Sequence, residues 1–333
     1  MVQLINTFLG SLISKCSKAQ IYNIGGCNLG ERPINFHIKA FKDLGLKVLE
    51  KNNSLKTKGH ISSADIILDY PSIGTTINII LAAVKNKRKT TVTIHNAAIE
   101  PEITDLCNFL NSMGANIEGI ETNELIIKSV KKLKGTNYTI ISDRIEAGTF
   151  LILGALHKGI TLRNANINHL QSLINILENI GCTIDTSYKL ISLSSNRNKS
   201  ISIETKPYPD FPTDLAPQLS VLASQLPGFS TISETVYHDR FSHINELKKL
   251  NIEIIKSLNH SFIKGNQQIS YNNLPLISRD LRQGASLILA ASLSDKPVVI
   301  QNTHYIERGY EDIYKKLSKL GFIIKEYTEK KNS

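Results

Sequence analysis

The chain has 333 residues, of which 41% are hydrophobic and 20% charged, and its formal net charge is +10. These values are typical of a globular protein with two domains and a sizeable core. No apolar run reaches the roughly 18 residues of a membrane span, so we expect no membrane partner.

Four cysteines lie far apart and form no CxxC pair, so the sequence predicts neither a zinc site nor a disulfide framework. We therefore expect no metal and a reducing, cytoplasmic location. The lysines are scattered and no nucleic-acid-binding motif occurs, so we expect small anionic substrates and no nucleic acid as partners. No GxxxxGK[ST] or Rossmann glycine pattern is present, and we expect no cofactor.

The first segment predicts an amphipathic helix with Leu4, Phe8, Leu9 and Leu12 on one face. After it, one pattern occurs five times: the end of a helix, a turn residue, and a short apolar strand. Glycine, or asparagine in its place, is the usual left-handed residue that ends a helix. The five turn residues, spaced by 67 to 70 positions, are Gly45, Gly114, Gly181, Asn251 and Gly321.

Between these turns the sequence reads twice as strand, polar loop and helix. One helix of each repeat is apolar on nearly all sides and should be buried, while the other is more polar and should face outward. We predict an α/β fold with helices inside, sheets covered on one face, and loops gathered at one end. A doubly wound sheet is the alternative, but it does not require this period.

The loop GGCNLGERP, residues 25 to 33, brings a thiol close to a guanidinium. A neighbouring cation such as Arg32 lowers the pKa of a thiol and makes it more reactive. A lone cysteine is more often a small buried hydrophobic residue. Because glycines on both sides argue against burial, we interpret Cys27 as reactive and the cysteines at 16, 107 and 182 as structural.

The segment PYPDFPTD, residues 207 to 214, ends in an aspartate directly before an apolar helix. Asp214 could simply cap that helix. It could equally be a positioned carboxylate base, for which the rigidity of three prolines would be useful. The local sequence does not separate these two interpretations.

Arginines recur in the repeat loops, and only an anion would offset their mutual repulsion if these loops meet. They are Arg144, Arg240, Arg282 and Arg308, of which Arg144 is interpreted as structural because acidic residues flank it. The segment DYPSIGTT, residues 69 to 76, is favoured as a turn and helix cap, although a helix N-terminus can also receive a phosphate.

Seven of these segments together resemble the UDP-N-acetylglucosamine 1-carboxyvinyltransferases, which belong to the enolpyruvyl transferases. The resemblance runs from about residue 4 to 326 and rests on GGCNLGERP, HNAAIEPEITDL, SDRIEAGTFL, PYPDFPTDLAPQ, ISETVYHDRFSHINEL, RDLRQGASLILA and IERGYEDI. It implies a two-domain inside-out α/β barrel of repeated βαβαββ units. It also implies transfer of the enolpyruvyl group of phosphoenolpyruvate to the 3′-hydroxyl of UDP-N-acetylglucosamine, the first committed step of peptidoglycan precursor synthesis.

By this resemblance Cys27 is the general acid and Asp214 accepts the proton of the sugar hydroxyl. Arginines would hold the phosphate and carboxylate groups and stabilise an anionic intermediate. The residues implied to bind substrate are Arg32, Pro33, Ile34, Asn35, Phe36, Tyr70, Pro71, Ser72, Ile73, Asp214, Val236, Arg240, Arg282 and Arg308.

The family has six repeats and a GxKN loop, whereas this chain shows five turn residues and no GxKN sequence. We therefore expect residues 1–140 to form a partial enolpyruvyl transferase domain with an exposed apolar edge, and residues 141–333 to form a second domain. The chain could be complemented by an amino-terminal fragment. The alternative is a truncated or degenerate homologue that binds UDP-sugar without turnover, and for this chain alone we expect weak or absent activity.

Overall fold

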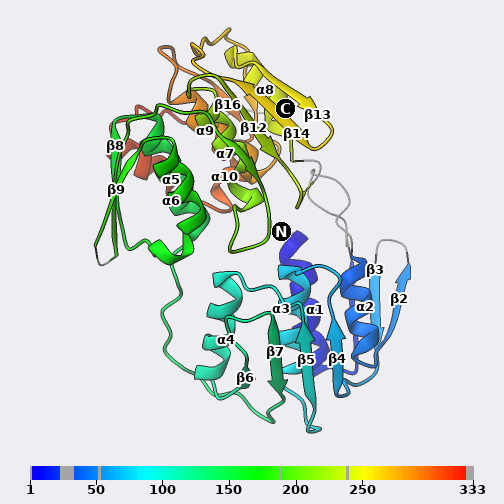
Figure 1. Cartoon of the computed structure of the whole chain (residues 1–333). Coiled ribbons are helices and arrows are strands. Elements are labelled where there is room, and N and C mark those ends of the chain that lie inside the picture. Colours follow the sequence, from blue (N-terminus) through cyan, green and yellow to red (C-terminus); the bar gives the residue numbers. More distant parts are fainter. Residues whose placement is uncertain (1, 23–33, 52–53, 188, 238–239, 328–333) are drawn as a thin grey trace. The chain divides into compact units, whose positions relative to one another are not determined.

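The structure, a computed structural model, describes residues 2–22, 34–51, 54–187, 189–237 and 240–327, with side chains from residue 8 onward. The chain divides into two compact units (Figure 1). The first comprises residues 1–142 and 206–212, and the second comprises residues 143–205 and 213–333. The short segment 206–212 therefore groups with the first unit although the residues on both sides of it belong to the second.

The first unit contains α1 (Val2–Lys15), β1 (Lys18–Tyr22), α2 (Asn35–Asp43), β2 (Lys47–Lys51), β3 (Ser54–Lys58), β4 (Ala64–Ile67), α3 (Ile73–Ala83), β5 (Thr91–His95), α4 (Pro101–Ser112), β6 (Asn116–Glu118) and β7 (Glu124–Lys128).

The second unit contains α5 (Arg144–Leu156), β8 (Gly159–Arg163), the 3-10 helix η1 (Ile167–His169), α6 (Gln171–Asn179), β9 (Thr183–Ser187), β10 (Leu190–Ser194), β11 (Ser202–Glu204), η2 (Thr213–Leu215), α7 (Ala216–Ala223), β12 (Phe229–Ser233), α8 (Ser242–Leu247), η3 (Lys248–Leu250), β13 (Ile254–Ser257), β14 (His260–Lys264), β15 (Leu276–Ile277), α9 (Leu281–Ala291), β16 (Ile300–Gln301), α10 (His304–Glu307) and α11 (Ile313–Lys319).

All five predicted turn residues have a positive φ, as a left-handed helix end requires. At each of them the next amide donates back across the last turn of the helix, for example Leu46 N to Phe41 O at 3.0 Å and Cys182 N to Leu177 O at 3.0 Å. Asn251, with φ of 63°, takes the same role as the glycines. The predicted repeat is therefore confirmed by backbone geometry.

The sheets repeat one plan. The orders β4-β5-β7-β6 and β11-β12-β14-β13 are identical, with the first pair parallel and the others antiparallel. The three-stranded sheets β1-β3-β2 and β8-β10-β9 keep only the antiparallel part. The remaining sheet pairs β15 with β16 in parallel. Repeated strand–helix units of this kind confirm the predicted α/β class.

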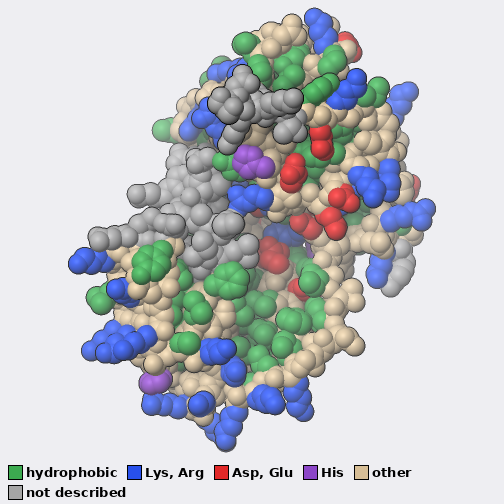
Figure 2. All heavy atoms as spheres, turned by 180° about the vertical axis from the view of Figure 1, so that it is seen from behind, with side chains coloured by type: hydrophobic (Ala, Val, Ile, Leu, Met, Phe, Trp, Pro, Cys, Tyr) green, Lys and Arg blue, Asp and Glu red, His purple; other side chains and the backbone are tan. Residues whose placement is uncertain are grey.

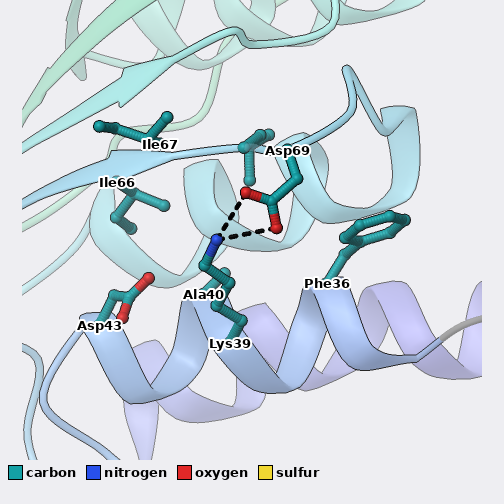
Figure 3. Close-up of a pocket in the computed structure, with 8 residues that line it drawn as sticks. Phe36, Lys39, Ala40, Asp43, Ile66, Ile67 and Asp69 are labelled. Carbon is teal, nitrogen blue, oxygen red and sulfur yellow. Dashed lines mark hydrogen bonds and ion pairs between the residues drawn. The ribbon is translucent and has the colours of Figure 1, made fainter.

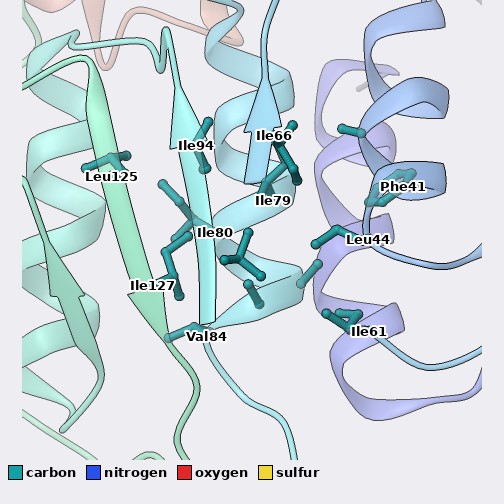
Figure 4. Close-up of a cluster of buried hydrophobic side chains, with 14 of the residues drawn as sticks. Phe41, Leu44, Ile61, Ile66, Ile79, Ile80, Val84, Ile94, Leu125 and Ile127 are labelled. Atoms are coloured by element: carbon teal, nitrogen blue, oxygen red, sulfur yellow. The ribbon is translucent and has the colours of Figure 1, made fainter. Parts of the chain in front are cut away.

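The apolar helices are buried, as their sequences predict. Most residues of α3, α5 and α9 and all residues of α7 are buried, whereas α4 and α6 bury only one face. In the first unit the core lies between α3 and the strands that flank it, with Ile79 and Ile80 packed among Ile66, Ile94 and Ile127 (Figure 4). An inner helix that is apolar all round and a sheet covered on one face follow from this packing.

The face predicted for the first helix is wrong in part. Among the apolar side chains of α1 from residue 8 onward, Leu9 and Ile13 are buried, whereas Phe8 and Leu12 are 59% and 40% exposed. Gly10 lets α1 approach α3 closely, because a Cβ there would lie 2.3 Å from Asn78 O. This close contact fixes the rotation of α1 and leaves Phe8 and Leu12 exposed.

None of the helices in the described ranges is both long and apolar enough to cross a membrane.

Candidate functional site

Three aspartates precede buried helices of the second unit, and the structure separates their roles. Asp143 accepts hydrogen bonds from the amides of Ile145 and Glu146 at 2.7 and 3.1 Å and caps α5. Asp280 caps α9 in the same way. Asp214 lies in η2 instead, and α7 begins after Leu215 without a side-chain cap. The carboxylate of Asp214 is therefore free for another task.

That task is to bind two guanidinium groups. Arg282 Nη2 donates to Asp214 Oδ2 at 2.7 Å, and Arg240 Nη1 lies 2.9 Å from Asp214 Oδ1. The arginine side chains are only 16% and 8% exposed, and that of Asp214 is 33% exposed. A partly exposed carboxylate thus neutralises two guanidinium groups that are largely shielded from solvent.

The charges set the protonation state of this carboxylate. Burial by itself would raise the pKa of Asp214, but the positive charges of Arg282, Arg240 and Arg144 outweigh that effect and hold its pKa well below its ordinary range. Arg144 therefore acts on the site electrostatically, although the sequence interpretation made it structural. In this state Asp214 is ionised at neutral pH and is a weak base.

Arg240 has unused hydrogen-bonding capacity. Its Nε is buried and has no hydrogen-bond acceptor among the described residues, and its Nη1, also buried, has the 2.9 Å ion pair with Asp214 as its contact there. Buried polar groups normally find a partner, and those that do not require an explanation. Guanidinium N–H groups left in this way are suited to bind the oxygens of an anionic ligand.

Glu234 holds the surrounding backbone in place. This carboxylate is 1% exposed and accepts hydrogen bonds from the hydroxyls of Thr205 and Thr213 at 2.8 and 2.7 Å. It also accepts from the amides of Val236 and Tyr237 at 3.0 and 2.7 Å. One buried side chain therefore fixes Thr213, next to Asp214, and the turn that leads to Arg240. The sequence offered no signal for this role beyond a glutamate at the end of a strand.

The other residues of this unit that the resemblance implies are Val236 and Arg308, and neither pairs with Asp214 in the structure. Val236 is half-buried, and its amide is held by Glu234. Arg308 follows α10, is exposed, and makes no ion pair with the described residues. The structure thus brings Asp214, Arg240 and Arg282 together, and Arg308 has no ion pair with any of the three.

The implied UDP-sugar residues of the first unit lie around the start of α2 and the loop before α3. Phe36 and Tyr70 stack with ring centroids 6.4 Å apart and planes at 20°. Ser72 caps α3, accepting from the amide of Thr75 at 3.3 Å, so the cap interpretation of this loop is confirmed. Asn35 is exposed at the first turn of α2, and Ile34, directly before it, is half-buried. Pro71 and Ile73, on either side of Ser72, are also half-buried.

A shallow surface depression lies beside this group, between α2 and β4 (Figure 3). Lys39 and Asp69 form an ion pair of 2.7 Å across it, and Phe36 lies at one end. The sequence analysis did not single out Lys39. Asp69, however, opens the DYPSIGTT segment that it did single out.

Most of the loop GGCNLGERP, which we interpreted as reactive, lies outside the described residues. Cys27, Arg32 and Pro33 lie outside the described residues. Of the remaining cysteines, Cys107 and Cys182 are buried, whereas Cys16 is exposed, so the interpretation of Cys16 as a buried structural residue is wrong. Burial raises the pKa of Cys107 to about 12 and also raises the pKa of Cys182, as the structural interpretation of both predicts.

Basic side chains lie at many separate places on the face shown in Figure 2 and form no single stripe there. This distribution agrees with the scattered lysines of the sequence. In contrast, the cations of the candidate site are paired with a carboxylate.

Comparisons with known proteins agree on one family. The model of EPSP synthase (3-phosphoshikimate 1-carboxyvinyltransferase) matches residues 6–317. The UDP-N-acetylglucosamine 1-carboxyvinyltransferase of Halothermothrix orenii is 43% identical over 316 residues, which cover 94% of this chain and 75% of the relative. The protein of that name from Thermotoga maritima is 38% identical over 328 residues, covering 97% and 77%.

Solved structures show the same fold. The enolpyruvyl transferase NikO from Streptomyces tendae has a TM-score of 0.83 at 21% identity, and covers 94% of this chain and 75% of its own. EPSP synthase from Acinetobacter baumannii has a TM-score of 0.69 at 18% identity, covering 95% and 76%. The predicted inside-out α/β fold is thereby confirmed. On the sequence match and the fold together, this chain belongs to the enolpyruvyl transferase family, which includes the UDP-N-acetylglucosamine 1-carboxyvinyltransferases.

Proposed function

We propose that the chain transfers the enolpyruvyl group of phosphoenolpyruvate to the 3′-hydroxyl of UDP-N-acetylglucosamine and releases phosphate. The names of its relatives support this reaction. The observation that carries it is the buried Arg240, which pairs through Nη1 with the carboxylate that also binds Arg282, and whose buried Nε has no acceptor among the described residues. Such a site can hold an anionic substrate next to a base. We place this step of peptidoglycan precursor synthesis in the cytoplasm.

The chemistry requires both an acid and a base. The sugar hydroxyl oxygen bonds to the phosphate-bearing carbon of phosphoenolpyruvate, while the neighbouring methylene carbon takes a proton. Loss of phosphate and of one proton from the resulting methyl group then restores the double bond. We assign the acid to Cys27 and the base for the hydroxyl proton to Asp214, with Arg240 and Arg282 stabilising the anionic intermediate.

The low pKa of Asp214 implies that phosphoenolpyruvate binds before Asp214 accepts the proton. While two guanidinium groups hold the carboxylate, it cannot readily accept a proton. When Arg240 and Arg282 turn to the phosphate or carboxylate of phosphoenolpyruvate, Asp214 loses its partners and its basicity rises. We therefore propose that binding of the anionic substrate makes Asp214 a competent base.

We propose that the UDP-sugar is held by Asn35, Phe36 and the segment 70–73, together with Arg32, Pro33 and Ile34. We also propose that Val236 takes part in substrate binding. The stacked rings of Phe36 and Tyr70 support a site for a planar base. We further propose that Arg308 contributes to substrate binding, for which its exposed guanidinium is available. The two enolpyruvyl transferase domains would divide near residue 140.

We propose that full activity needs a complementing amino-terminal fragment. The chain has no GxKN sequence, and its match spans 75% of the relative from Halothermothrix orenii. Without the lysine of that loop the phosphate charge would be poorly compensated. Weak turnover by the chain alone, and stronger turnover with a fragment that supplies the loop, would follow.

An assay of phosphate release tests the proposed transfer reaction directly. Purified chain is mixed with phosphoenolpyruvate and UDP-N-acetylglucosamine, with and without an amino-terminal segment from a relative. Phosphate release that needs both substrates and is lost in Cys27→Ala and Asp214→Asn supports the proposal. UDP-sugar binding that survives Cys27→Ala, with no phosphate release under either condition, would instead favour a binding protein without turnover.

A further inference from the structure

The two arginines that bind Asp214 belong to two separate helix starts. Arg240 lies two residues before Ser242, where α8 begins, and Arg282 lies in the first turn of α9. The distance between the two guanidinium groups therefore depends on how the start of α8 is held against the start of α9.

Gln283 joins these two helix starts through its side-chain amide. Its Nε2 donates to Ser242 O at 3.0 Å, and its Oε1 accepts from the amide of Arg279 at 2.7 Å. A glutamine three residues after a helix cap ordinarily reaches back to its own helix start, and glutamate serves there equally well. The bond from Nε2 needs an amide, because an ionised carboxylate has no N–H to donate. Gln283 therefore does more than support the start of α9.

Asp280 forms a second link between the same helix starts. Its Oδ1 accepts from the amides of Arg282 and Gln283, both at 2.9 Å, while its Oδ2 accepts from Ser242 Oγ at 3.0 Å. Asp280 and Gln283 are 3% and 1% exposed, so these bonds are shielded from water. Phe241, at the cap position of α8, has no polar side chain that could hold this start. The start of α8 is therefore held by Asp280 and Gln283.

The other end of α8 is held independently. The amide of Ile277, in β15, donates to Glu246 Oε2 at 2.9 Å, and Glu246 is 5% exposed. Since β15 comes shortly before α9 in the chain, both ends of α8 are bound to one continuous segment. Loss of the bond from Gln283 would therefore loosen only the start of α8, which is the end next to Arg240.

We propose that Gln283 is a positioning residue that keeps the guanidinium of Arg240 beside that of Arg282, so that both bind one anion. This inference rests on the proposed function, in which these arginines hold phosphoenolpyruvate. In the free chain Asp214 holds the two groups together, with contacts of 2.7 and 2.9 Å to its two oxygens. When an anion draws the arginines away from Asp214, the link between the helix starts has to keep them together.

The test replaces Gln283 by methionine, which has nearly the same length and no amide. The matched control is Gln225→Met, because Gln225 lies in the same unit and its Nε2 also donates to a distant backbone carbonyl, Gln267 O, at 3.1 Å. Calorimetry measures the binding of phosphoenolpyruvate and of UDP-N-acetylglucosamine to each full chain. We expect Gln283→Met to weaken phosphoenolpyruvate binding about fivefold, the loss of one neutral hydrogen bond, and Gln225→Met to leave it unchanged.

The second ligand separates positioning from folding. A loss of stability lowers the apparent affinity for every ligand in proportion to the folded fraction of the chain. Loss of positioning should instead lower the affinity of Gln283→Met for phosphoenolpyruvate and leave its affinity for UDP-N-acetylglucosamine unchanged. Circular dichroism checks that each variant is folded at the temperature of the calorimetry.

A further measurement needs no substrate. The Nε–H of Arg240 is buried, and nitrogen-15 NMR follows its exchange with water, with the signal assigned by its loss in Arg240→Lys. We expect faster exchange in Gln283→Met than in the wild type or Gln225→Met. Gln283→Glu should behave like Gln283→Met, because it keeps the acceptor for Arg279 and loses the donor to Ser242, and it carries this test if Gln283→Met does not fold.

The outcomes separate the inference from the proposed function. If the wild type binds no phosphoenolpyruvate but exchange at Arg240 still rises in both Gln283 variants, the positioning of Arg240 stands and the proposed function fails. Two results would overturn the inference and leave the proposed function intact. One is equal exchange in the Gln283 variants and Gln225→Met. The other is faster exchange with unchanged phosphoenolpyruvate affinity, which would make the link structural only.

Discussion

Removing the negative charge of Asp214 should destabilise the second unit, because Asp214→Asn leaves two buried guanidinium groups without a counter-charge. Breaking a fully buried ion pair costs about 3–5 kcal/mol. The Asp214 side chain is 33% exposed, so solvent screens part of this loss. We therefore expect the free energy of unfolding to fall by roughly 2–3 kcal/mol.

The assay is urea unfolding at pH 7 followed by far-ultraviolet circular dichroism, since the chain has no tryptophan. The matched control is Asp185→Asn, on the exposed strand β9, where no ion pair is lost within the described part of the chain. This control should change the free energy of unfolding by less than about 0.5 kcal/mol.

The dependence on pH gives a second check. A carboxyl group whose pKa is lowered on folding contributes stability that is complete above the pKa of the unfolded chain, about 3.9, and is lost as pH falls below it. The difference between wild type and Asp214→Asn should thus be constant from pH 7 to about 5 and shrink toward pH 3. Equal stability of Asp214→Asn and Asp185→Asn at pH 7 would refute the reasoning.

Three further predictions concern other parts of the molecule. Burial lowers the pKa of His37 to about 4, so protonation favours unfolding, and the first unit should lose stability as pH falls from about 6.5; His37→Gln should flatten this loss in pH-dependent urea unfolding. Gly10→Ala should destabilise by about 1–3 kcal/mol through its clash with α3, although alanine is normally better in a helix. The control is Gly135→Ala, because a Cβ at Gly135 would have no atom within 4 Å, and we expect it to leave the midpoint of thermal unfolding nearly unchanged. Equal effects of the two substitutions on that midpoint would contradict the clash at Gly10. Glu234→Gln should cost about 1–3 kcal/mol, because an amide cannot accept all four hydrogen bonds; unchanged chemical denaturation would count against the role of this carboxylate.

The sequence by itself determined the repeated architecture. The left-handed helix ends at Gly45 and Asn251 depend on neighbouring residues only, and a residue without a steric penalty at positive φ reveals them. The burial of α5 and α9 likewise follows from helices that are apolar on all sides. These features are local, so a single chain read in order is enough to predict them.

The tertiary structure decided what the local sequence could not. Asp143, Asp214 and Asp280 all precede an apolar helix, yet two cap it and one binds arginines from distant parts of the chain. Arg240 and Arg282 lie 26 and 68 residues after Asp214 in the sequence, but both come within 3 Å of its carboxylate in the structure. The difference arises because a guanidinium group is a stronger partner for a carboxylate than a backbone amide. The exposed face of α1 is of the same kind, since its contact with α3 fixes the rotation of the helix. Local patterns therefore gave the scaffold, and the charges and contacts that make a site emerged only when distant segments met.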